Sequence, residues 1–364
     1  VEDDPRGRGD GRIKLFPDGE GGIVCNWKGE TRPFFADDGR TLSESERRER
    51  DRKRQEAIRQ AKDEYARRYA EGAKKASAIW RAAQPARDDH PYLTRKGVKA
   101  TETLREIHAD KAAEILGYRP QAKTGPLTGR VLVAPVKVGA KLSTCELIDE
   151  AGRKSAIYGG AKAGGYWAAQ PLPEGDGPEP LQIGEGVATV LSGKEANGRL
   201  SIAALSAGNL PAVAKSMRER YPTRPLIFLA DLVKATGAPD PHAIEAARSV
   251  GGLVAVPDFG TDRPEGATDF NDMAVQYGLD AVRHAIVSVI ELAMGEYQPD
   301  QENPPGGIAE DCPEALTPKA GGALTKTDVT NVTDVQPNND APPSVTDDEQ
   351  DDVTGVTPDP AIPD

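Results

Sequence analysis

The chain of 364 residues is poor in aromatic side chains and has no long apolar run. Aromatic residues make up 5% of the sequence, and no apolar run approaches the roughly 18 to 20 residues that a membrane-spanning helix requires. The N-terminus lacks the charged, apolar and small-residue segments of a signal peptide. These absences predict a cytoplasmic protein without a membrane partner. Because the chain begins at Val1 rather than at methionine, we expect it to be a piece of a longer protein.

Two further absences exclude particular kinds of site. The three cysteines, Cys25, Cys145 and Cys312, stand far apart and form no CxxC pair, which excludes a zinc ribbon and argues against a disulfide framework. No GxxxxGK[ST] segment occurs, since the Gly-Lys pair at 193 is followed by glutamate and has no glycine at the required upstream spacing. The chain therefore has no P-loop, and any ATP-driven motor that accompanies it is not part of this chain.

The last 67 residues differ from the rest in composition. Residues 298–364 contain no Phe, Trp or Tyr, eleven of the 30 prolines, fifteen acidic residues and two basic ones, Lys319 and Lys326. The formal net charge of the whole chain is −12, so its acidity belongs to this segment and the remainder is close to neutral. Such a segment cannot bury enough apolar surface to offset its conformational entropy, which predicts a disordered acidic tail at 298–364.

Two different elements are predicted in the first 87 residues. Residues 12–35 hold short apolar runs separated by Asp-Gly, Gly-Gly and Lys-Gly pairs, which predict a small β element within 1–40. From 43 to about 84 only Gly72 interrupts a run rich in Arg, Lys, Glu and Ala, which predicts a long basic helix within 41–87. Between Arg40 and Arg81 we count fourteen basic and eight acidic residues. The helix is either solvated and stabilised by i,i+4 ion pairs, or it contacts phosphates.

The apolar pattern changes between 172 and 178. Residues 88–172 combine a short helix around Ala109–Leu116 with β-rich runs over 128–158, which predict an antiparallel meander in a β-rich lobe. In residues 178–295 continuous apolar strands alternate with helices, which predicts a Rossmann-like parallel sheet with helices on both faces. The predicted fold class is therefore mixed, α+β followed by α/β. The strands are expected at 181–184, 201–206, 225–231 and 252–258, and the helices at 187–197, 210–220, from 240 onward and at 279–292.

Acidic residues follow the predicted parallel strands at their carboxyl ends, where such sheets bind ligands. Glu185 follows the first strand, Asp231 ends the third, Asp258 ends the fourth, and Asp269 and Asp272 lie in the loop beyond it. Two ionised carboxylates about 4 Å apart repel by about 4 kcal/mol at an effective dielectric near 20, so clustered acids require a shared proton or a cation. All-oxygen ligation without His or Cys favours Mg²⁺ or Mn²⁺ over zinc. Taken singly, each acid is more often a helix cap or a turn residue than a metal ligand.

Six segments occur in a fixed order between about 88 and 290: HPYLTRKGV, LVAPV followed by LIDEAGRKSAIYGG, GEGVATVLS, ALSAGNLPAVAKSMRERYP, VAVPDFG and TDFNDM. Together they resemble DNA primases of conjugative plasmids and related phages, and GEGVATVL looks like the glutamate motif of the TOPRIM fold. The resemblance implies a β-rich primase lobe followed by a TOPRIM lobe. It also implies synthesis of RNA primers on single-stranded DNA from ribonucleoside triphosphates, and a replicative helicase or conjugation protein as a partner.

The resemblance carries over to individual residues. Glu185 matches the TOPRIM glutamate and Asp231 the first aspartate of the DxD pair that holds Mg²⁺ or Mn²⁺, so these two are the predicted catalytic and metal-binding residues. The second aspartate is replaced by Val233, which cannot bind a metal. Either another acid, with Asp269 and Asp272 as the predicted additional ligands and Asp258 as a further candidate, completes the site, or this copy is catalytically weak.

Four basic residues are the predicted nucleotide- or DNA-binding set. Lys154 falls where the family has a basic residue, and Arg130, Lys141 and Lys162 accompany it as candidates for binding triphosphates or the template backbone. Any one of them is more often an ordinary solvated side chain.

Several aromatic and histidine side chains have two interpretations. Tyr92, Tyr166 and Trp167 either stack on bases or pack in the core. His90 and His242 precede prolines or follow them closely and are interpreted as turn or cap residues.

The predicted function is Mg²⁺-dependent primer synthesis in plasmid or phage replication or conjugation. The main alternative is a catalytically impaired TOPRIM module that binds DNA or regulates a larger mobile-element protein, and a nuclease is the third. The zinc-ribbon module that commonly precedes such primase cores is absent, so recognition of the template would require another domain or the basic helix.

Overall fold

The computed structural model describes residues 11–15, 19, 21–26, 31–35, 43–261 and 263–294. The predicted acidic tail at 298–364 lies outside these residues. Within the described ranges, no helix combines the length and apolar character needed to cross a membrane.

The N-terminal β element is a three-stranded antiparallel sheet, as predicted. Its strands are joined in the order β1-β2-β3, and Ile13 of β1 pairs with Val24 of β2, which keeps the register of a simple meander. The strands are β1 (Gly11–Leu15), β2 (Gly21–Asn26) and β3 (Thr31–Phe35).

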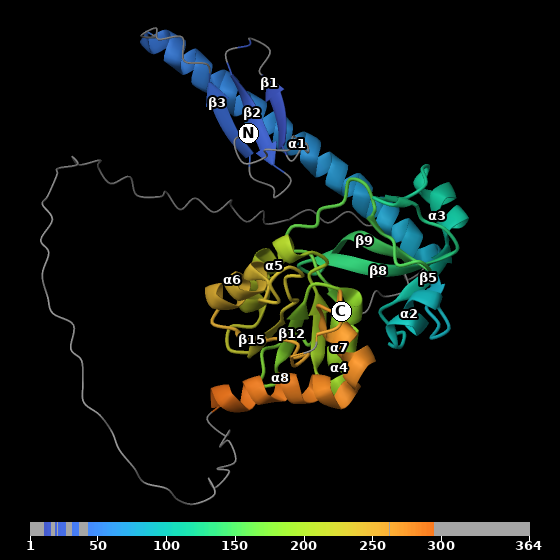
Figure 1. Ribbon diagram of the computed structural model, residues 1–364. Coiled ribbons are helices and arrows are strands. Elements are labelled where there is room, and N and C mark those ends of the chain that lie inside the picture. The colour runs from blue at the N-terminus through green and yellow to red at the C-terminus, as the bar shows by residue number, and fades with distance from the viewer. Residues whose placement is uncertain are drawn as a thin grey trace, which may run out of the picture. The chain divides into compact units, whose positions relative to one another are not determined.

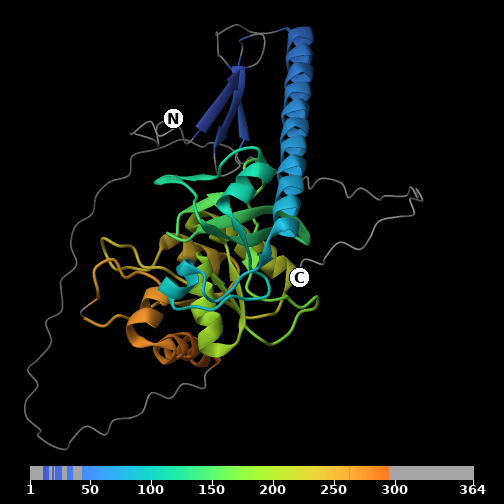
Figure 2. The ribbon, with the colours of Figure 1, turned by 90° about the vertical axis from the view of Figure 1, so that its right-hand side faces the viewer.

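The predicted long helix is α1 (Glu44–Ala82), the extended blue helix of Figures 1 and 2. It begins with a capping box, in which the Ser43 hydroxyl accepts a hydrogen bond from the Glu46 amide and the Glu46 carboxylate accepts one from the Ser43 amide. Only its C-terminal third is buried, where Ile79 and Trp80 enter a core with β9 and α3. Gly72 allows this close approach, because a Cβ at that position would lie 2.6 Å from the carbonyl carbon of Gly159.

The antiparallel lobe, residues 84–158, contains a five-stranded sheet in the order β10-β9-β8-β5-β4. The predicted meander forms its centre, and β8 and β9 pair along most of their length with one irregularity after Val136. One face packs against the end of α1 and α3. The strands are β4 (Gln84–Pro85), β5 (Arg105–His108), β8 (Arg130–Val138), β9 (Lys141–Asp149) and β10 (Lys154–Ala156); α2 (Pro91–Lys96), α3 (Ala109–Leu116) and the hairpin β6 (Gln121–Ala122) and β7 (Gly125–Pro126) complete the lobe.

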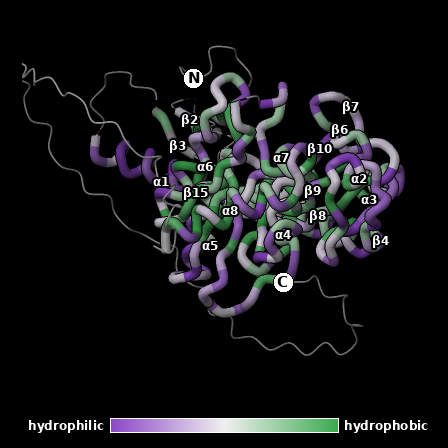
Figure 3. Tube along the Cα trace, turned by 60° about the horizontal axis from the view of Figure 1, so that its bottom comes forward, coloured by the Kyte–Doolittle hydropathy of each residue, from purple (hydrophilic) through white to green (hydrophobic). Residues whose placement is uncertain are grey.

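The parallel lobe, residues 166–294, contains a second sheet in the order β11-β13-β12-β14-β15, of which the last four strands are parallel. Alternate residues of β14 face opposite sides: Leu226 and Phe228 pack toward α5 and α6, and Ile227 and Leu229 toward α7 and α8. Helices therefore cover both faces, as Figure 1 shows, and the apolar segments that Figure 3 draws in green lie in the interior. The elements are β11 (Trp167–Ala168), β12 (Leu181–Gly184), α4 (Val187–Asn197), β13 (Leu200–Ala203), the 3-10 helix η1 (Ala207–Asn209), α5 (Leu210–Arg220), β14 (Leu226–Leu229), α6 (Pro241–Ser249), β15 (Leu253–Ala255), α7 (Phe270–Tyr277) and α8 (Leu279–Met294).

The two lobes share backbone and core contacts. Tyr166 exchanges two hydrogen bonds with Lys137 of β8, and the next residue, Trp167, begins β11, which adds antiparallel to the parallel sheet. The buried Asn209 side chain donates to the carbonyls of Gly165 and Ala204, each at 2.8 Å. The segment after β10 therefore ends as an edge strand of the other sheet. Tyr166 and Trp167 are both buried in this junction, which supports their interpretation as packing residues.

Candidate active site

The candidate site lies at the carboxyl ends of two neighbouring parallel strands. β12 and β14 are adjacent, and their register pairs Gly184 with Leu229. Glu185 therefore leaves the sheet beside the end of β14, and Asp231 follows two residues after Leu229. The chain passes from β12 to β13 on one side of β12, and then from β13 to β14 on the other side of β12. The ends of β12 and β14 therefore form the topological switch point at which open α/β sheets bind ligands.

Glu185 is held by the loop that follows β13. Its backbone carbonyl accepts a hydrogen bond from the Leu205 amide at 2.8 Å, and its carboxylate accepts one from the Ala207 amide. Leu205 has φ +65°, a left-handed conformation that is unfavourable for a branched side chain and is characteristic of constrained functional loops. Burial raises the pKa of Glu185, and the positive charge of Lys154 opposes this increase. The carboxylate is thus fixed in place at a partly desolvated position.

Asp231 has the least satisfied carboxylate at this edge. Its Oδ1 atom is buried and has no hydrogen-bond partner. Burial, followed by the negative charges of Asp269, Glu185 and Asp240, raises the pKa of Asp231 to about 8, and Lys154 again opposes the shift. A buried oxygen without a partner and a carboxyl group that retains its proton near neutral pH are both costly arrangements, unless a cation binds there.

Asp269 and Asp272 are the two halves of the capping box of α7. Asp269 Oδ1 accepts a hydrogen bond from the Asp272 amide at 2.7 Å, and Asp272 Oδ2 accepts one from the Thr268 amide at 2.9 Å. The remaining Asp269 oxygen accepts from the Thr189 hydroxyl at 3.3 Å. The helix-cap interpretation therefore describes both residues, and Asp269 in addition acts electrostatically on Asp231.

The remaining candidate acid, Asp258, lies away from this set. It is exposed and its Oδ1 accepts a hydrogen bond from the Gly260 amide at 2.8 Å, which is a local turn contact. Asp258 is therefore a turn residue, which was the other interpretation of the acids in the sequence analysis.

The carboxylates form an incomplete set of metal ligands. No group of three His, Cys, Asp or Glu side chains among the described residues lies close enough together to hold a metal ion without rearrangement. The residues nevertheless fit a hard cation, because Asp231 has an unpartnered buried oxygen and the neighbouring charges of Glu185 and Asp269 both disfavour its ionisation. A divalent cation would reverse the sign of that electrostatic interaction.

A cavity of about 270 Å³ adjoins the carboxylates. Three cationic side chains line it, Arg95 and Lys96 from the end of α2 and Lys154 from the start of β10. Lys154 and Asp269 belong both to the cavity wall and to the electrostatic environment of Asp231. A cavity with three cations next to a set of carboxylates is suited to a polyanion that arrives together with a metal ion. Its other lining residues are Tyr92, Ala151, Gly152, Gly186, Ala188 and Thr189.

Asn271 connects three of the helices that contribute residues to or beside the cavity wall. This fully buried side chain donates to the backbone carbonyl of Lys96 at 2.6 Å and to the hydroxyl of Ser192 at 3.0 Å. It thereby links α7 and α4 to the end of α2. The ammonium group of Lys96 also lies 3.6 Å from the carboxylate of Asp272.

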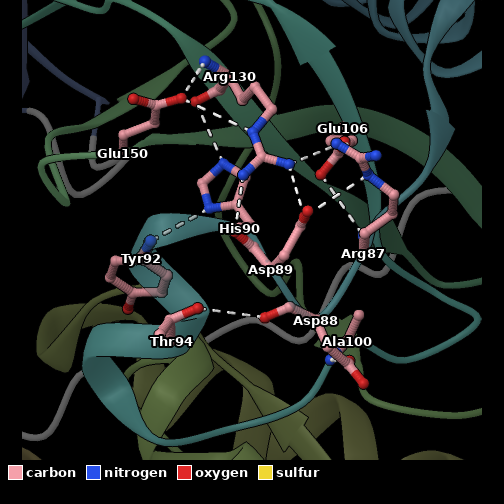
Figure 4. A network of polar contacts seen from close by, with 10 residues as sticks. All are labelled: Arg87, Asp88, Asp89, His90, Tyr92, Thr94, Ala100, Glu106, Arg130 and Glu150. Atoms are coloured by element: carbon pink, nitrogen blue, oxygen red, sulfur yellow. Dashed lines mark hydrogen bonds and ion pairs between the residues drawn. The ribbon is translucent and has the colours of Figure 1, made fainter.

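Of the four predicted basic residues, only Lys154 lies at this site. Arg130 is engaged in the network of Figure 4, where its guanidinium contacts Asp89 at 2.7 Å and Glu106 at 3.6 Å. Lys162 pairs with the buried Glu146 at 2.8 Å. Lys141 is exposed at the start of β9, beside the β8–β9 turn. Arg130 and Lys162 therefore compensate carboxylates of the antiparallel lobe.

The same network explains His90. The ring is fully buried, its Nδ1 accepts a hydrogen bond from the Tyr92 amide at 3.2 Å as the N-cap of α2, and its Nε2 lies 3.1 Å from the carbonyl oxygen of Arg130. Burial lowers the pKa of His90, which keeps the ring neutral. The prediction that His90 is a cap is confirmed. His242 is the second residue of α6, and its ring contacts the N-cap Asp240 at 3.0 Å.

The sequence analysis missed three residues of the site. Arg95 and Lys96 occur in the HPYLTRKGV segment, but the short helix α2, which places both side chains in the cavity wall, was not predicted. Asp240 stands at the start of the helix predicted from 240 onward, and in the structure it is the N-cap of α6. Its negative charge also raises the pKa of Glu185 and of Asp231, which places it in the same group of acids.

Comparison with known proteins supports the resemblance found in the sequence. No family model matches the chain. Over 193 residues it is 28% identical to a DNA primase TraC of Escherichia coli, and the aligned region covers 50% of this chain and 16% of that protein. A second DNA primase TraC of Escherichia coli is 29% identical over 181 residues, covering 48% and 11%. This chain is distantly homologous to DNA primase TraC.

The matched region is small relative to these relatives, because the chain spans less than a fifth of their length. Among solved structures, the RNA polymerase domain of Mycobacterium tuberculosis primase DnaG aligns with 63% of this chain and 86% of its own, at 15% identity and a TM-score of 0.37. The predicted fold class, an antiparallel lobe followed by a mostly parallel sheet with helices on both faces, is confirmed by the strand order of this chain itself.

Proposed function

We propose that the protein is a DNA primase that synthesises short RNA primers on single-stranded DNA by metal-dependent nucleotidyl transfer. The observation that carries the proposal is the adjacency of a cavity with three cations to a carboxylate pair at the ends of β12 and β14. The homology to DNA primase TraC supports the same chemistry. Neither feature alone distinguishes a primase from another phosphate-binding protein, but a nucleotidyl transferase requires both.

The cationic side chains have a direct role in this reaction. Arg95, Lys96 and Lys154 would bind the triphosphate of the incoming ribonucleotide and orient its α-phosphate toward the carboxylate edge. The 3′-hydroxyl of the growing primer then attacks the α-phosphorus and loses its proton to solvent, a new O–P bond forms, the bond to the β-phosphate breaks, and pyrophosphate leaves. The same three cations would stabilise the charge that accumulates on the departing pyrophosphate.

Glu185 and Asp231 are the proposed ligands of Mg²⁺ or Mn²⁺, with Asp269 contributing negative charge beside them. When bound, the ion supplies polarisation of the phosphate and compensation of negative charge. Glu185 is held for this role by the Ala207 amide, and Asp231 offers a buried oxygen without a partner. Asp272 is held by two amides and the Lys96 ammonium, so it contributes through the α7 cap.

Primer synthesis tests the proposal. The full chain is incubated with single-stranded DNA, labelled ribonucleotides and Mg²⁺ or Mn²⁺, and products are resolved by length. We expect products from the wild type and a loss of at least about 10²-fold with Glu185→Gln, which keeps the shape of the side chain and removes the charge that holds the cation. The matched control is Asp258→Asn, which changes an exposed acid after the next strand and should leave synthesis unchanged. Full synthesis by Glu185→Gln contradicts the assignment.

A second function is favoured by one specific feature, Val233. If the valine marks lost chemistry, the chain is a DNA-binding or regulatory module of a larger mobile-element protein, with a helicase or conjugation protein as partner. That function predicts retained binding of single-stranded DNA without products in either metal. The assay above, run beside a fluorescence-anisotropy titration of labelled DNA, separates the two functions.

A further inference from the structure

Most of α1 lies outside the hydrophobic core. Its buried residues begin at Gly72, so residues 44–71, which span about 42 Å at a rise of about 1.5 Å per residue, contribute no fully buried side chain. Ion pairs within the helix, such as Arg48 with Glu44 and Arg52 with Glu49, account for its first turns as a solvated helix. They do not account for the tyrosines that occur further along it.

Two tyrosines and an arginine are grouped on α1 just before the helix enters the core. The ring centroids of Tyr65 and Tyr69 lie 6.1 Å apart, and the guanidinium carbon of Arg68 lies 4.7 Å from the first centroid and 5.8 Å from the second. These distances are those of cation–π contacts, which hold the arginine beside the rings. Tyr69 is nevertheless 40% exposed. The group therefore presents an aromatic ring and a positive charge to solvent together.

A third tyrosine, Tyr158, lies beside the same part of α1. The next residue, Gly159, packs so closely on the helix that a Cβ there would lie 3.2 Å from the carbonyl oxygen of Arg68. The Tyr158 amide donates to the hydroxyl of Tyr118 at 2.7 Å, which fixes the backbone. The Tyr158 side chain is 65% exposed, more than that of any other aromatic residue that the structure describes. Packing explains where its backbone lies, but leaves its ring in water.

A short strand connects this tyrosine to the cavity. Lys154, which lines the cavity, begins β10, and Tyr158 follows four residues later, at most about 13 Å away at about 3.3 Å per residue. β10 is the edge strand of its sheet. The adjoining stretch of α1, residues 62–75, carries an excess of basic side chains: Lys62, Arg67, Arg68, Lys74 and Lys75 against Asp63, Glu64 and Glu71. Exposed rings and positive charge thus lie within a short distance of the cavity.

We infer that Tyr69 and Tyr158, together with the basic residues of α1 at 62–75, form a surface that binds single-stranded DNA and leads it along β10 to the cavity. The rings stack on bases without sequence preference, and the basic side chains contact phosphates. An unpaired strand fits better than a duplex, because only an unpaired strand exposes the faces of its bases. The inference rests on the proposed function for the role of the strand as template, and it selects phosphate contact for this part of α1.

Equilibrium binding tests the inference without using activity. Fluorescence anisotropy of the full chain is measured with chelator and without nucleotide, so metal binding and catalysis do not enter. One labelled strand is oligo-dT, and the other has the same length and phosphates but only abasic sites, so the difference between them reports stacking. The matched variants are Tyr158→Leu, which removes the aromatic face, and Tyr158→Phe, which keeps it. Tyr277→Leu changes an exposed tyrosine of α7 and is the control for position.

We expect Tyr158→Leu to weaken binding of oligo-dT by at least about fivefold and to leave binding of the abasic strand unchanged. Tyr69→Leu should have a smaller effect in the same direction, because this ring is less exposed. Tyr158→Phe and Tyr277→Leu should bind both strands as the wild type does. Lys74→Gln should weaken binding of both strands and reduce the dependence of log affinity on log salt by about one.

Wild-type affinity of Tyr158→Leu for oligo-dT overturns the inference and leaves this surface to a protein partner. The inference also fails if Tyr158→Leu loses affinity for both strands equally, or if the wild type binds neither strand. None of these results bears on the proposed function, which fails only if the primer-synthesis assay yields no product. Conversely, a chain that makes no primers but shows the expected difference between Tyr158→Leu and Tyr158→Phe retains the DNA-binding surface.

Discussion

Carboxylates are treated differently in the two lobes. In the antiparallel lobe buried acids each face a cation: Asp149 is 2.7 Å from Arg153, and Glu146 is 2.8 Å from Lys162 in the segment that follows β10. In the parallel lobe Glu185 and Asp231 face other acids, with Lys154 as the opposing charge, and Asp231 retains an unpartnered oxygen. The first arrangement is complete within the protein, whereas the second requires a positive charge from outside. This difference separates acids that stabilise the fold from acids kept for a ligand.

The largest effect is expected from Asp149→Asn. This side chain is fully buried and accepts hydrogen bonds from the Arg153 amide, the Arg153 guanidinium and the Thr128 amide, at 2.8, 2.7 and 3.3 Å. Asparagine keeps the shape but removes the charge, so the free energy of unfolding should fall by about 3 kcal/mol. Denaturant unfolding measures it. A change within about 0.5 kcal/mol of zero would mean that the network of this lobe is not structural.

A somewhat smaller loss is expected from Lys162→Met. The Glu146 side chain is 6% exposed, and removal of its cation leaves a buried carboxylate without an opposite charge. We expect a decrease of about 2 kcal/mol in the free energy of unfolding. Lys141→Met removes an exposed lysine of the adjacent turn and serves as the control, with a change below about 0.5 kcal/mol. Equal effects of the two variants would remove the distinction between Lys162 as a structural residue and Lys141 as a surface residue.

Asp231→Asn should have the opposite sign. The pKa of Asp231 rises from its ordinary value of 3.8 to about 8 in the folded, metal-free protein. A raised pKa contributes stability that is fully present below the unfolded value and is lost as the pH rises through the folded value. The free energy of unfolding of the wild type should therefore decline between about pH 4 and pH 8, relative to the variant.

At pH 8 the metal-free Asp231→Asn protein should be more stable than the wild type, by on the order of 1 kcal/mol after allowance for solvent screening. At pH 4 the two should be nearly equal. Thermal or denaturant unfolding across this pH range, with chelator present, provides the measurement. A variant that is less stable than the wild type at pH 8 would show that this carboxylate has a partner within the protein, like those of the antiparallel lobe.

Much of the fold could be predicted because its signals are local. The strand at 181–184 and the helices at 187–197 and 210–220 match the structure to the residue, since short apolar strands alternate with helical segments that end shortly before a glycine or proline. The short helices α2 and α7 were missed. His90 is an unusual N-cap residue, and the capping box of α7 uses two aspartates in place of the usual Ser or Thr with Glu.

The site was harder to predict, because its decisive features arise from tertiary contacts. Nothing in the local sequence indicates that Arg130 and Lys162 pair with acids of the antiparallel lobe, whereas Lys154 lines the cavity beside the carboxylates of the parallel lobe. Asp240 lies beside Asp231 because the chain between them folds back, and the Asp240 amide donates a hydrogen bond to the Asp231 carbonyl at 2.8 Å. The DxD motif concerns position 233 and gives no indication of this contact. Glu185 and Asp231 were found because the ends of adjacent parallel strands necessarily meet at one edge.

One experiment contrasts the two kinds of carboxylate directly. The thermal unfolding midpoint of the full chain is measured at pH 8 with and without Mg²⁺ for the wild type, Asp231→Asn and Asp149→Asn. Because a ligand that binds only the folded state raises its stability, Mg²⁺ should raise the midpoint of the wild type and of Asp149→Asn, and leave that of Asp231→Asn unchanged. An equal shift in all three proteins, or none in the wild type, would contradict the conclusion that the carboxylates at the ends of β12 and β14 are kept for a metal ion.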